Sequence, residues 1–335
     1  MQRRFLDYIL ISLKGLAMGA ADAVPGVSGG TIAFISGIYE ELITTISNVN
    51  TSLIKTLKNQ GIKAFWKQLN GNFIVALLIG IIISFVSFMK LAKYLIEYHP
   101  VLIWSFFFGL IVASIYFVGK QIKKWNATTI IALIIGSAIA YYITTLPSLS
   151  NNDHPLFLLL AGAIAICAMI LPGISGSFIL LILGAYKTLS DAIHDIDIKR
   201  ICLFVFGAIV GLLSFSRVLK WLFKHYHNMT LAILTGFIFG SLNKVWPWKI
   251  TSLVFDKNSG ETLDFSSISQ FGTLTLHQQN INDFESLKLI SEYSVLPLEY
   301  AKQNQNIDPQ ITIAILLMVL GFFTIFFLEK LGKKS

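Results

Sequence analysis

Two short stretches place the same polar residues inside apolar sequence. The first motif (residues 25–31) lies in VPGVSGGTIAFISGIYE and the second motif (residues 172–177) in LPGISGSFILLILGAYK. Proline and glycine interrupt a helix, so each motif exposes backbone N–H groups that lipid cannot bond. A helix that begins after such a turn favours an anion such as phosphate. The predicted binding residues are Pro25, Gly26, Ser28, Gly29, Gly30 and Thr31 in the first motif, and Pro172, Gly173, Ser175, Gly176 and Ser177 in the second.

A structural interpretation of the same residues is that the glycines let helices pack closely and the serines cap them. The duplication favours a ligand site. Pro25, Gly26, Ser28 and Gly29 align with residues 147 positions later, as do Gly37 with Gly184 and Tyr39 with Tyr186.

Acidic residues accompany only the first motif. Asp22 precedes Pro25 by three positions, and its aligned counterpart is Met169. Burying an ionisable group in a membrane segment costs free energy, so Asp22 is the first functional candidate among these acids and Glu41 the second. The alternatives are that Asp22 is a cap or a partner of Lys14, and that Glu40 and Glu41 are a solvated pair.

Two pairs of cations form a further candidate. Lys90 and Lys93, like Arg217 and Lys220, are three residues apart, which places each pair on one helix face. Cations at helix ends often set membrane topology, and this suits Arg217 and Lys220. Lys90 and Lys93 are predicted to lie outside, against that rule. The pairs therefore suggest a cationic mouth on each face that attracts an anionic headgroup.

The fold class follows from composition. Of 335 residues, 55% are hydrophobic and 13% are charged, which indicates an all-α polytopic membrane protein. The net charge of +8 comes mostly from span ends and short loops, which favours orientation by the positive-inside rule over nucleic-acid binding. Cys167 and Cys202 lie in apolar segments, and neither a metal site nor a cofactor motif is predicted.

Two repeats organise the predicted fold. The first repeat (1–150) has a re-entrant hairpin at 5–47 and spans near 72–95, 101–119 and 127–146. The second (151–335) has a hairpin at 156–190, spans near 201–223, 229–247 and 311–329, and a polar extracytoplasmic insert at 250–309 that contains a small β-hairpin. At an offset of 127, SFMKLAKYL aligns with SFSRVLKWL, with Gly80 opposite Gly207 and Gly109 opposite Gly236.

The repeats are predicted to be inverted, because each contains three spans. Inverted repeats with broken helices are typical of secondary transporters, whose substrate site lies between the repeats. A loop with Lys55, Lys58, Lys63 and Lys67 is expected on the cytoplasmic side, and both termini are placed there as well.

An enzymatic interpretation is weaker. Gly26-Val27-Ser28-Gly29-Gly30 matches the G-x-S-x-G pattern of a hydrolase nucleophile, but that motif needs a preceding strand and a histidine partner.

GAADAVPGVSGGTIAFISGIYEELI and ILPGISGSFILLILGAY together resemble the bacterial polyprenyl-phosphate transporters of the PopT type, over nearly the whole chain. The resemblance implies that the chain lies in the bacterial cytoplasmic membrane and moves undecaprenyl phosphate from its outer to its inner leaflet. It also assigns binding to Pro25–Thr31 and Pro172–Ser177. Inward movement of an anion opposes an inside-negative potential by about 2.3 kcal/mol per charge per 100 mV. A proton or sodium ion is therefore expected to travel with the lipid, with Asp22 as the first candidate carrier and Glu41 as the second.

Two other functions stay open as alternatives, an intramembrane undecaprenyl diphosphate phosphatase and a transporter of small anions. Phosphatases of that kind have Glu, His and Arg beside their turn, and neither motif contains these residues.

Overall fold

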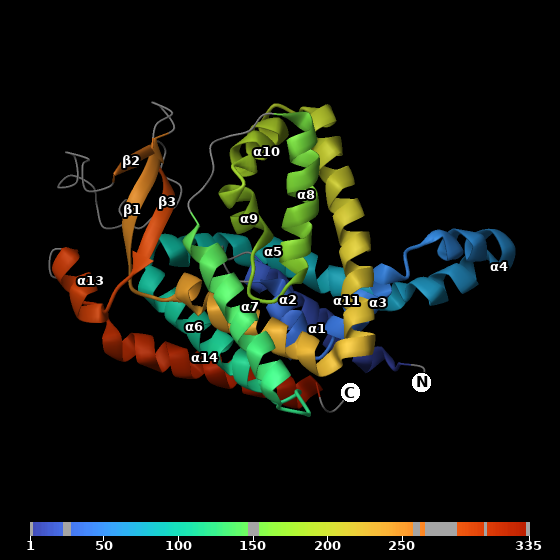
Figure 1. The fold of residues 1–335 in the computed structure, drawn as a ribbon, viewed down its shortest axis with the longest axis horizontal. Coiled ribbons are helices and arrows are strands. Elements are labelled where there is room, and N and C mark those ends of the chain that lie inside the picture. Colours follow the sequence, from blue (N-terminus) through green and yellow to red (C-terminus); the bar gives the residue numbers. More distant parts are fainter. Residues whose placement is uncertain are drawn as a thin grey trace. The chain divides into compact units, whose positions relative to one another are not determined.

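The chain is mostly helical in the computed structural model, which describes residues 3–22, 28–146, 154–256, 262–264, 287–304 and 307–332 (Figure 1). It divides into two compact units. The first unit comprises Met1–Met89, Ser114–Ser241 and Phe326–Ser335, and the second comprises Lys90–Ala113 and Leu242–Ile325. Pro25 and Gly26 lie outside the described residues.

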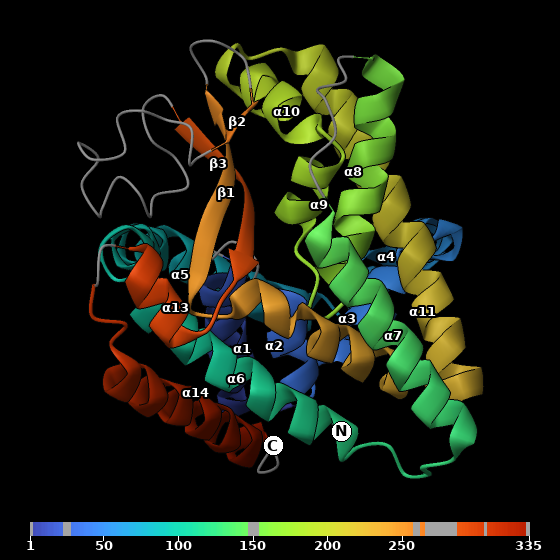
Figure 2. The same cartoon turned by 60° about the vertical axis from the view of Figure 1, so that its left-hand side comes forward.

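The first unit is built from helices. In chain order they are α1 (Phe5–Asp22), α2 (Gly29–Ile35), α3 (Tyr39–Ser47), α4 (Thr51–Leu69), α5 (Gly71–Tyr98, whose last turns belong to the second unit), α7 (Ala127–Thr145), α8 (Pro155–Ile170), α9 (Gly176–Ile182), α10 (Ala185–His194) and α11 (Ile198–Gly240). A 3₁₀ turn, Ser241–Val245, follows α11. Figure 2 shows α7 and α8 beside the long α11.

Helices occupy the expected membrane spans, with one difference. α5, α6 (Pro100–Gly119), α7 and α14 (Ile311–Gly332) match four of them, whereas the spans expected at 201–223 and 229–247 are joined in α11. α11 bends at Tyr226, whose φ of −134° and ψ of 45° are not helical. The helix continues because residues 224–228 contain neither glycine nor proline.

By length and composition, the described part of the chain contains three helical stretches that can cross a membrane: Pro100–Gly119, Ala127–Thr145 and Ile198–Val245. A fourth candidate joins α4 to the start of α5 across a bend of 49°. The connection that carries Lys55, Lys58, Lys63 and Lys67 was expected as a loop and forms helix α4 instead, because only Gly61 interrupts its helix-forming sequence.

Both motifs interrupt a helix, as expected. α1 ends at Asp22 and α2 begins at Gly29, while α8 ends at Ile170 and α9 begins at Gly176. Each stretch contains three helices where two were expected. Gly37 (φ 74°) and Gly184 (φ 69°) adopt left-handed backbone, which ends the short helix and starts another. α2 and α9 begin and end 147 residues apart.

The helices of the two stretches also pack alike. Gly15 of α1 approaches the backbone of Leu77 on α5, and Gly162 of α8 approaches that of Phe204 on α11. The glycines of these two contacts differ by 147 positions and their partners by 127, which are the offsets found in the sequence. A third pair extends the pattern, because Gly109 of α6 approaches Met318 on α14 as Gly236 of α11 approaches Leu133 on α7.

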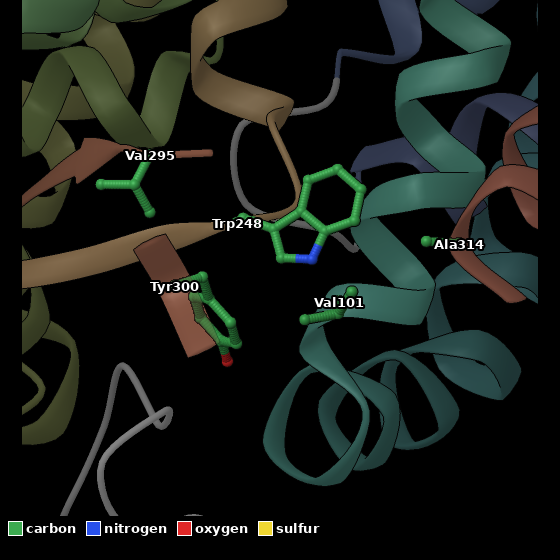
Figure 3. Packing of buried hydrophobic residues seen from close by; sticks show 5 residues of the cluster. All are labelled: Val101, Trp248, Val295, Tyr300 and Ala314. Carbon is green, nitrogen blue, oxygen red and sulfur yellow. The ribbon is translucent and has the colours of Figure 1, made fainter. Parts of the chain in front are cut away.

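The second unit combines the start of α6 and most of α14 with a small sheet. β1 (Lys249–Asp256) pairs antiparallel with β2 (Thr262–Asp264) and with β3 (Leu287–Ser294), in the order β2-β1-β3. The pairing of β1 with β2 confirms the hairpin expected in the polar insert. Helix α13 (Pro297–Gln303) follows β3. The core contains Val101, Trp248, Val295, Tyr300 and Ala314 (Figure 3).

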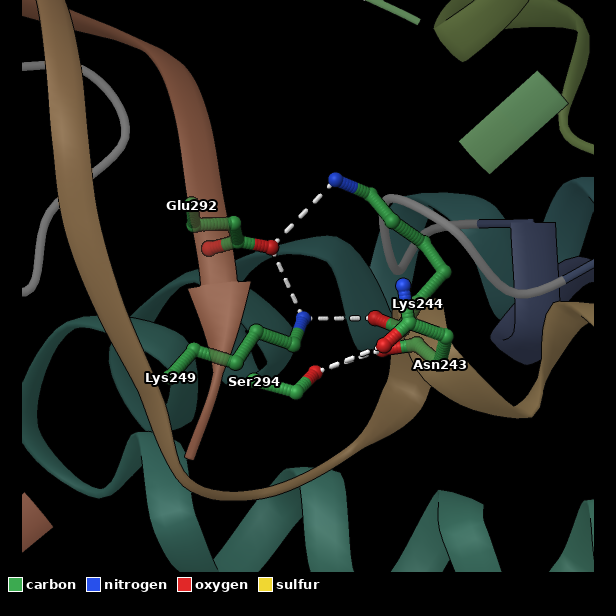
Figure 4. Close-up of polar contacts among 5 residues, drawn as sticks. All are labelled: Asn243, Lys244, Lys249, Glu292 and Ser294. Atoms are coloured by element: carbon green, nitrogen blue, oxygen red, sulfur yellow. Dashed lines mark hydrogen bonds and ion pairs between the residues drawn. The ribbon is translucent and has the colours of Figure 1, made fainter. Parts of the chain in front are cut away.

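A charged cluster in this unit joins β1 to β3 (Figure 4). Lys249 Nζ lies 2.8 Å and Lys244 Nζ 3.3 Å from one carboxylate oxygen of Glu292. Lys249 also lies over the ring of Trp104, 4.5 Å from its centroid. Burial opposes ionisation of Glu292, but the two ammonium groups outweigh it and lower the pKa of this carboxyl. The charges of this cluster therefore satisfy one another.

Candidate functional site

Two side chains of the protein accept hydrogen bonds from the backbone N–H groups at the start of α2. Asp22 Oδ1 accepts a hydrogen bond of 2.7 Å from the Gly29 N–H, and Ser28 Oγ accepts one of 3.2 Å from the Gly30 N–H. Ser28 has the extended backbone of an N-cap residue. A Cβ at Gly29 would collide with the Asp22 carboxylate. The donors expected to receive phosphate are thus held by a carboxylate and a hydroxyl.

The two motifs meet in space. Thr31 Oγ1 accepts a hydrogen bond of 2.9 Å from the N–H of Gly173, and the hydroxyl of Tyr39 donates one of 3.1 Å to the carbonyl of Ile170. A Cβ added to Gly30 would lie 2.7 Å from that same carbonyl oxygen. Residues 28–31 and 170–173 are therefore in direct contact.

The two sides of this contact differ in burial. Ser28, Thr31 and Tyr39 are 3%, 1% and 2% exposed. Ser175 is half-buried and Ser177 is exposed, and their hydroxyl oxygens lie 2.9 Å apart. The hydroxyls of the second motif are therefore the more accessible ones.

Tyr39 was not predicted as a site residue. The available signal was its alignment with Tyr186 at the offset of the motifs. Its ring packs edge-on against Phe34 and Phe223, with centroids 4.7 and 6.0 Å away. This packing directs its hydroxyl towards the end of α8, so Tyr39 positions one motif against the other.

The cations on α11 bind the end of α3. Arg217 donates to the carbonyl of Val49 at 3.0 Å, and Lys220 donates to the side-chain oxygen of Asn48 at 3.3 Å. Cations near a helix C-terminus complement its dipole, so this contact stabilises α3. Lys90 and Lys93 lie on α5, but their side chains are outside the described residues.

Glu41 is held in a network rather than left free. Arg3 forms two hydrogen bonds of 2.6 Å with its carboxylate, and Asn70 donates a third of 2.8 Å. The neighbouring Glu40 lies 3.1 Å from a ring nitrogen of His227, next to the bend in α11. Arg3, Asn70 and His227 could not be identified from spacing, because they come from distant segments.

A cavity of about 570 Å³ opens beside this network. Its walls come from α1, the turn after α2 and the end of α6. Its charged lining residues are Arg3, Asp7, Lys14, Glu41 and Lys120. Lys14 lines this cavity, about two helical turns from Asp22, so the two are not a pair. Within the described chain, no group of three or more His, Cys, Asp or Glu side chains could hold a metal ion.

The chain is similar in sequence to proteins of one family. A family model described as VCA0040-like, undecaprenyl phosphate translocase-like, matches residues 18–263. A polyprenyl-phosphate transporter of Vibrio cholerae serotype O1 is 41% identical over 334 residues, which cover 100% of both chains. A polyprenyl-phosphate transporter of Staphylococcus aureus is 33% identical over 271 residues, or 72% of this chain and 87% of its own. No solved structure matches the chain significantly.

Proposed function

Because the chain belongs to the undecaprenyl phosphate translocase-like family, we propose that it moves undecaprenyl phosphate from the outer to the inner leaflet of the cytoplasmic membrane. The lipid would then be reused as a carrier in cell-wall synthesis. The observation that carries this proposal is the direct contact between the two motifs through Thr31 and Gly173. It gathers backbone N–H groups and hydroxyls from both halves of the chain at one place.

The duplicated packing supports a transporter made of two inverted repeats. Glycine contacts recur at the sequence offsets, and α2 and α9 are equivalent in length. Two halves that share one interface can rock about it and open the site to either leaflet in turn. The prenyl tail would stay in lipid while the headgroup passes between the motifs. Residues 25–31 and 172–177 would bind the phosphate, with Lys90, Lys93, Arg217 and Lys220 as cations at the two mouths.

Asp22 gives this mechanism a means of ion coupling. Its carboxylate holds the Gly29 N–H, a donor that the phosphate would also use. Two anions cannot share this donor at low cost, so binding of the headgroup favours a protonated Asp22 or a cation beside it. Uptake of the proton and of the lipid is then linked. One proton carried inward per negative charge cancels the work of about 2.3 kcal/mol per 100 mV that the membrane potential imposes.

Glu41 would have a structural role. Arg3 and Asn70 already bind it, so it would orient α3 and the cavity wall, while Asp22 exchanges the ion. Both termini would lie in the cytoplasm, which places the cavity lined by Arg3 and Lys120 near the inner face. The headgroup would leave through this side.

The test is a leaflet-resolved assay in proteoliposomes of the purified protein. Undecaprenyl phosphate is added to one leaflet, and its arrival in the other is followed by accessibility to a membrane-impermeant reagent. We expect arrival to be accelerated by protein and competed by unlabelled undecaprenyl phosphate. Equal rates with and without protein would refute the proposal. Release of inorganic phosphate from undecaprenyl diphosphate would indicate the phosphatase instead, and competition by free phosphate alone would indicate a small-anion transporter.

A further inference from the structure

Helix α4 extends from the first unit and leaves most of its described side chains exposed. In Figure 1 it runs beyond α3 and doubles back on itself. The bend is at Gly61, whose φ is 80°, and the side chains of Ser52 and Gln68 meet at 3.1 Å, so the two arms lie side by side. Leu53 is its only buried residue among those described. A helical hairpin with so little core needs another surface to stabilise it.

Each arm of α4 is amphipathic. The first arm exposes Ile54 (57%) and Leu57 (42%), and the second exposes Ile62 (73%) and Trp66 (43%). Spacings of three and four residues place each pair on one face of its arm. The exposed lysines of the hairpin are Lys55, Lys58, Lys63 and Lys67, and residues 51–70 contain no acid.

Hydrogen bonds fix the base of the α4 hairpin to α3 and to the start of α5. Asn70 has left-handed backbone (φ 56°) and donates 2.8 Å and 3.3 Å hydrogen bonds to Glu41 and Thr45 on α3. α5 begins at the next residue, after a bend of 49°. Trp66 donates a 2.7 Å bond to Asn72 at the start of α5, which holds its ring at this elbow. Tryptophan prefers the membrane interface, so the elbow belongs at headgroup level.

We propose that α4 is an in-plane anchor that binds the anionic phospholipids of the leaflet beside it. The apolar pairs would enter the acyl boundary and the lysines would attract lipid phosphates. A second membrane crossing by α4 is disfavoured, because it would bury four lysines with no acidic partner in the segment. This role is independent of lipid transport, since a helix can anchor whether or not the protein translocates its substrate.

The test uses the full chain with Cys167 and Cys202 replaced by serine and a nitroxide on a single cysteine introduced as Ile54→Cys or Ile62→Cys. Nanodiscs contain phosphatidylcholine alone or an equimolar mixture with phosphatidylglycerol. We expect the labels to be accessible to oxygen and protected from a water-soluble nickel chelate, more strongly in the anionic nanodiscs. Labels that the chelate reaches equally well in the two kinds of nanodisc would overturn the proposal. Protection that changed with the number of protein copies per nanodisc, and not with the lipid charge, would also overturn it.

The matched variants are Lys63→Gln/Lys67→Gln in α4 and Lys123→Gln/Lys124→Gln after α6. Each lysine near an anionic surface changes the binding equilibrium constant about fivefold. The double substitution in α4 should therefore lower the ratio of buried to exposed label about 25-fold in anionic nanodiscs. The control pair should leave it unchanged. An equal loss in both variants would contradict a specific role of α4. If a labelled variant does not fold, a label introduced as Leu57→Cys reports on the same face as Ile54.

Discussion

The two motifs of this chain share a sequence pattern but differ in their surroundings. The first has an acid that holds one of its backbone donors, and its hydroxyls are buried against the second. In the second, Met169 replaces the acid, and the two serines bond each other at a more accessible position. Duplication can therefore supply two similar turns of which only one has an acid beside it. We propose that the first motif controls transport and that the second contacts the substrate.

Replacement of Asp22, the acid of the first motif, should have the largest effect on the difference between the motifs. In Asp22→Asn the side chain can still accept the Gly29 N–H bond but can no longer carry a proton. We expect pH-driven accumulation of undecaprenyl phosphate in proteoliposomes to fall about tenfold for each pH unit of imposed gradient, while exchange without a gradient persists.

Asp197→Asn is the matched control for Asp22→Asn. Asp197 accepts a 3.2 Å bond from the N–H of Arg200 at the start of α11, so its loss also removes a carboxylate bound to backbone. Driven accumulation should survive in this variant. Unchanged pH dependence in Asp22→Asn would eliminate Asp22 as the coupling residue.

Alanine substitutions at Gly30 and Gly176 test whether the fold needs the contact between the motifs. A methyl group at Gly30 would lie 2.7 Å from the carbonyl oxygen of Ile170, whereas one at Gly176 would lie 2.8 Å from that of Ala165 on the preceding helix. Both Gly30→Ala and Gly176→Ala should lower the free energy of unfolding by about 3 kcal/mol through overpacking. Only Gly30→Ala should push the motifs apart.

A double-mutant cycle in detergent separates these two effects. Gly30→Ala and Thr31→Val act on the same interface, so their combined loss of unfolding free energy should be smaller than the sum. Gly176→Ala and Thr31→Val should be additive. Additivity in both cycles would mean that the motifs do not depend on each other.

Sequence patterns predicted the features of this molecule that follow from local chemistry. Apolar segments identified the helices at the expected spans, and Pro-Gly turns identified both interruptions. The sequence did not predict that α11 continues through residues 224–228 or that α4 forms a hairpin, because a polar segment between apolar ones can be loop or helix. Partners such as Arg3 for Glu41 and Ile170 for Tyr39 depend on tertiary packing, which one sequence does not encode in its spacing.

The bond between Thr31 and Gly173 gives a smaller and more local test. Thr31→Val preserves shape but leaves the half-buried N–H of Gly173 without its acceptor, which should lower the free energy of unfolding by about 2 kcal/mol. Thr31→Ser keeps the oxygen and should retain most of the stability. A thermal or denaturant titration in detergent measures both. Equal losses in the two variants would assign the effect to the methyl group instead of the bond.

The serines should show the smallest effects and the clearest contrast between the motifs. Ser28→Ala removes an N-cap from a buried helix start, which should lower the free energy of unfolding by about 1 kcal/mol. Ser175→Ala removes a bond to the exposed Ser177 and should change stability by less than about 0.5 kcal/mol. Transport should rank the two variants in the opposite order, because the accessible hydroxyl is the one free to meet a phosphate. If Ser28→Ala impaired transport more than stability, and Ser175→Ala impaired neither, the substrate contact would belong to the first motif, and the division of roles between the motifs would be reversed.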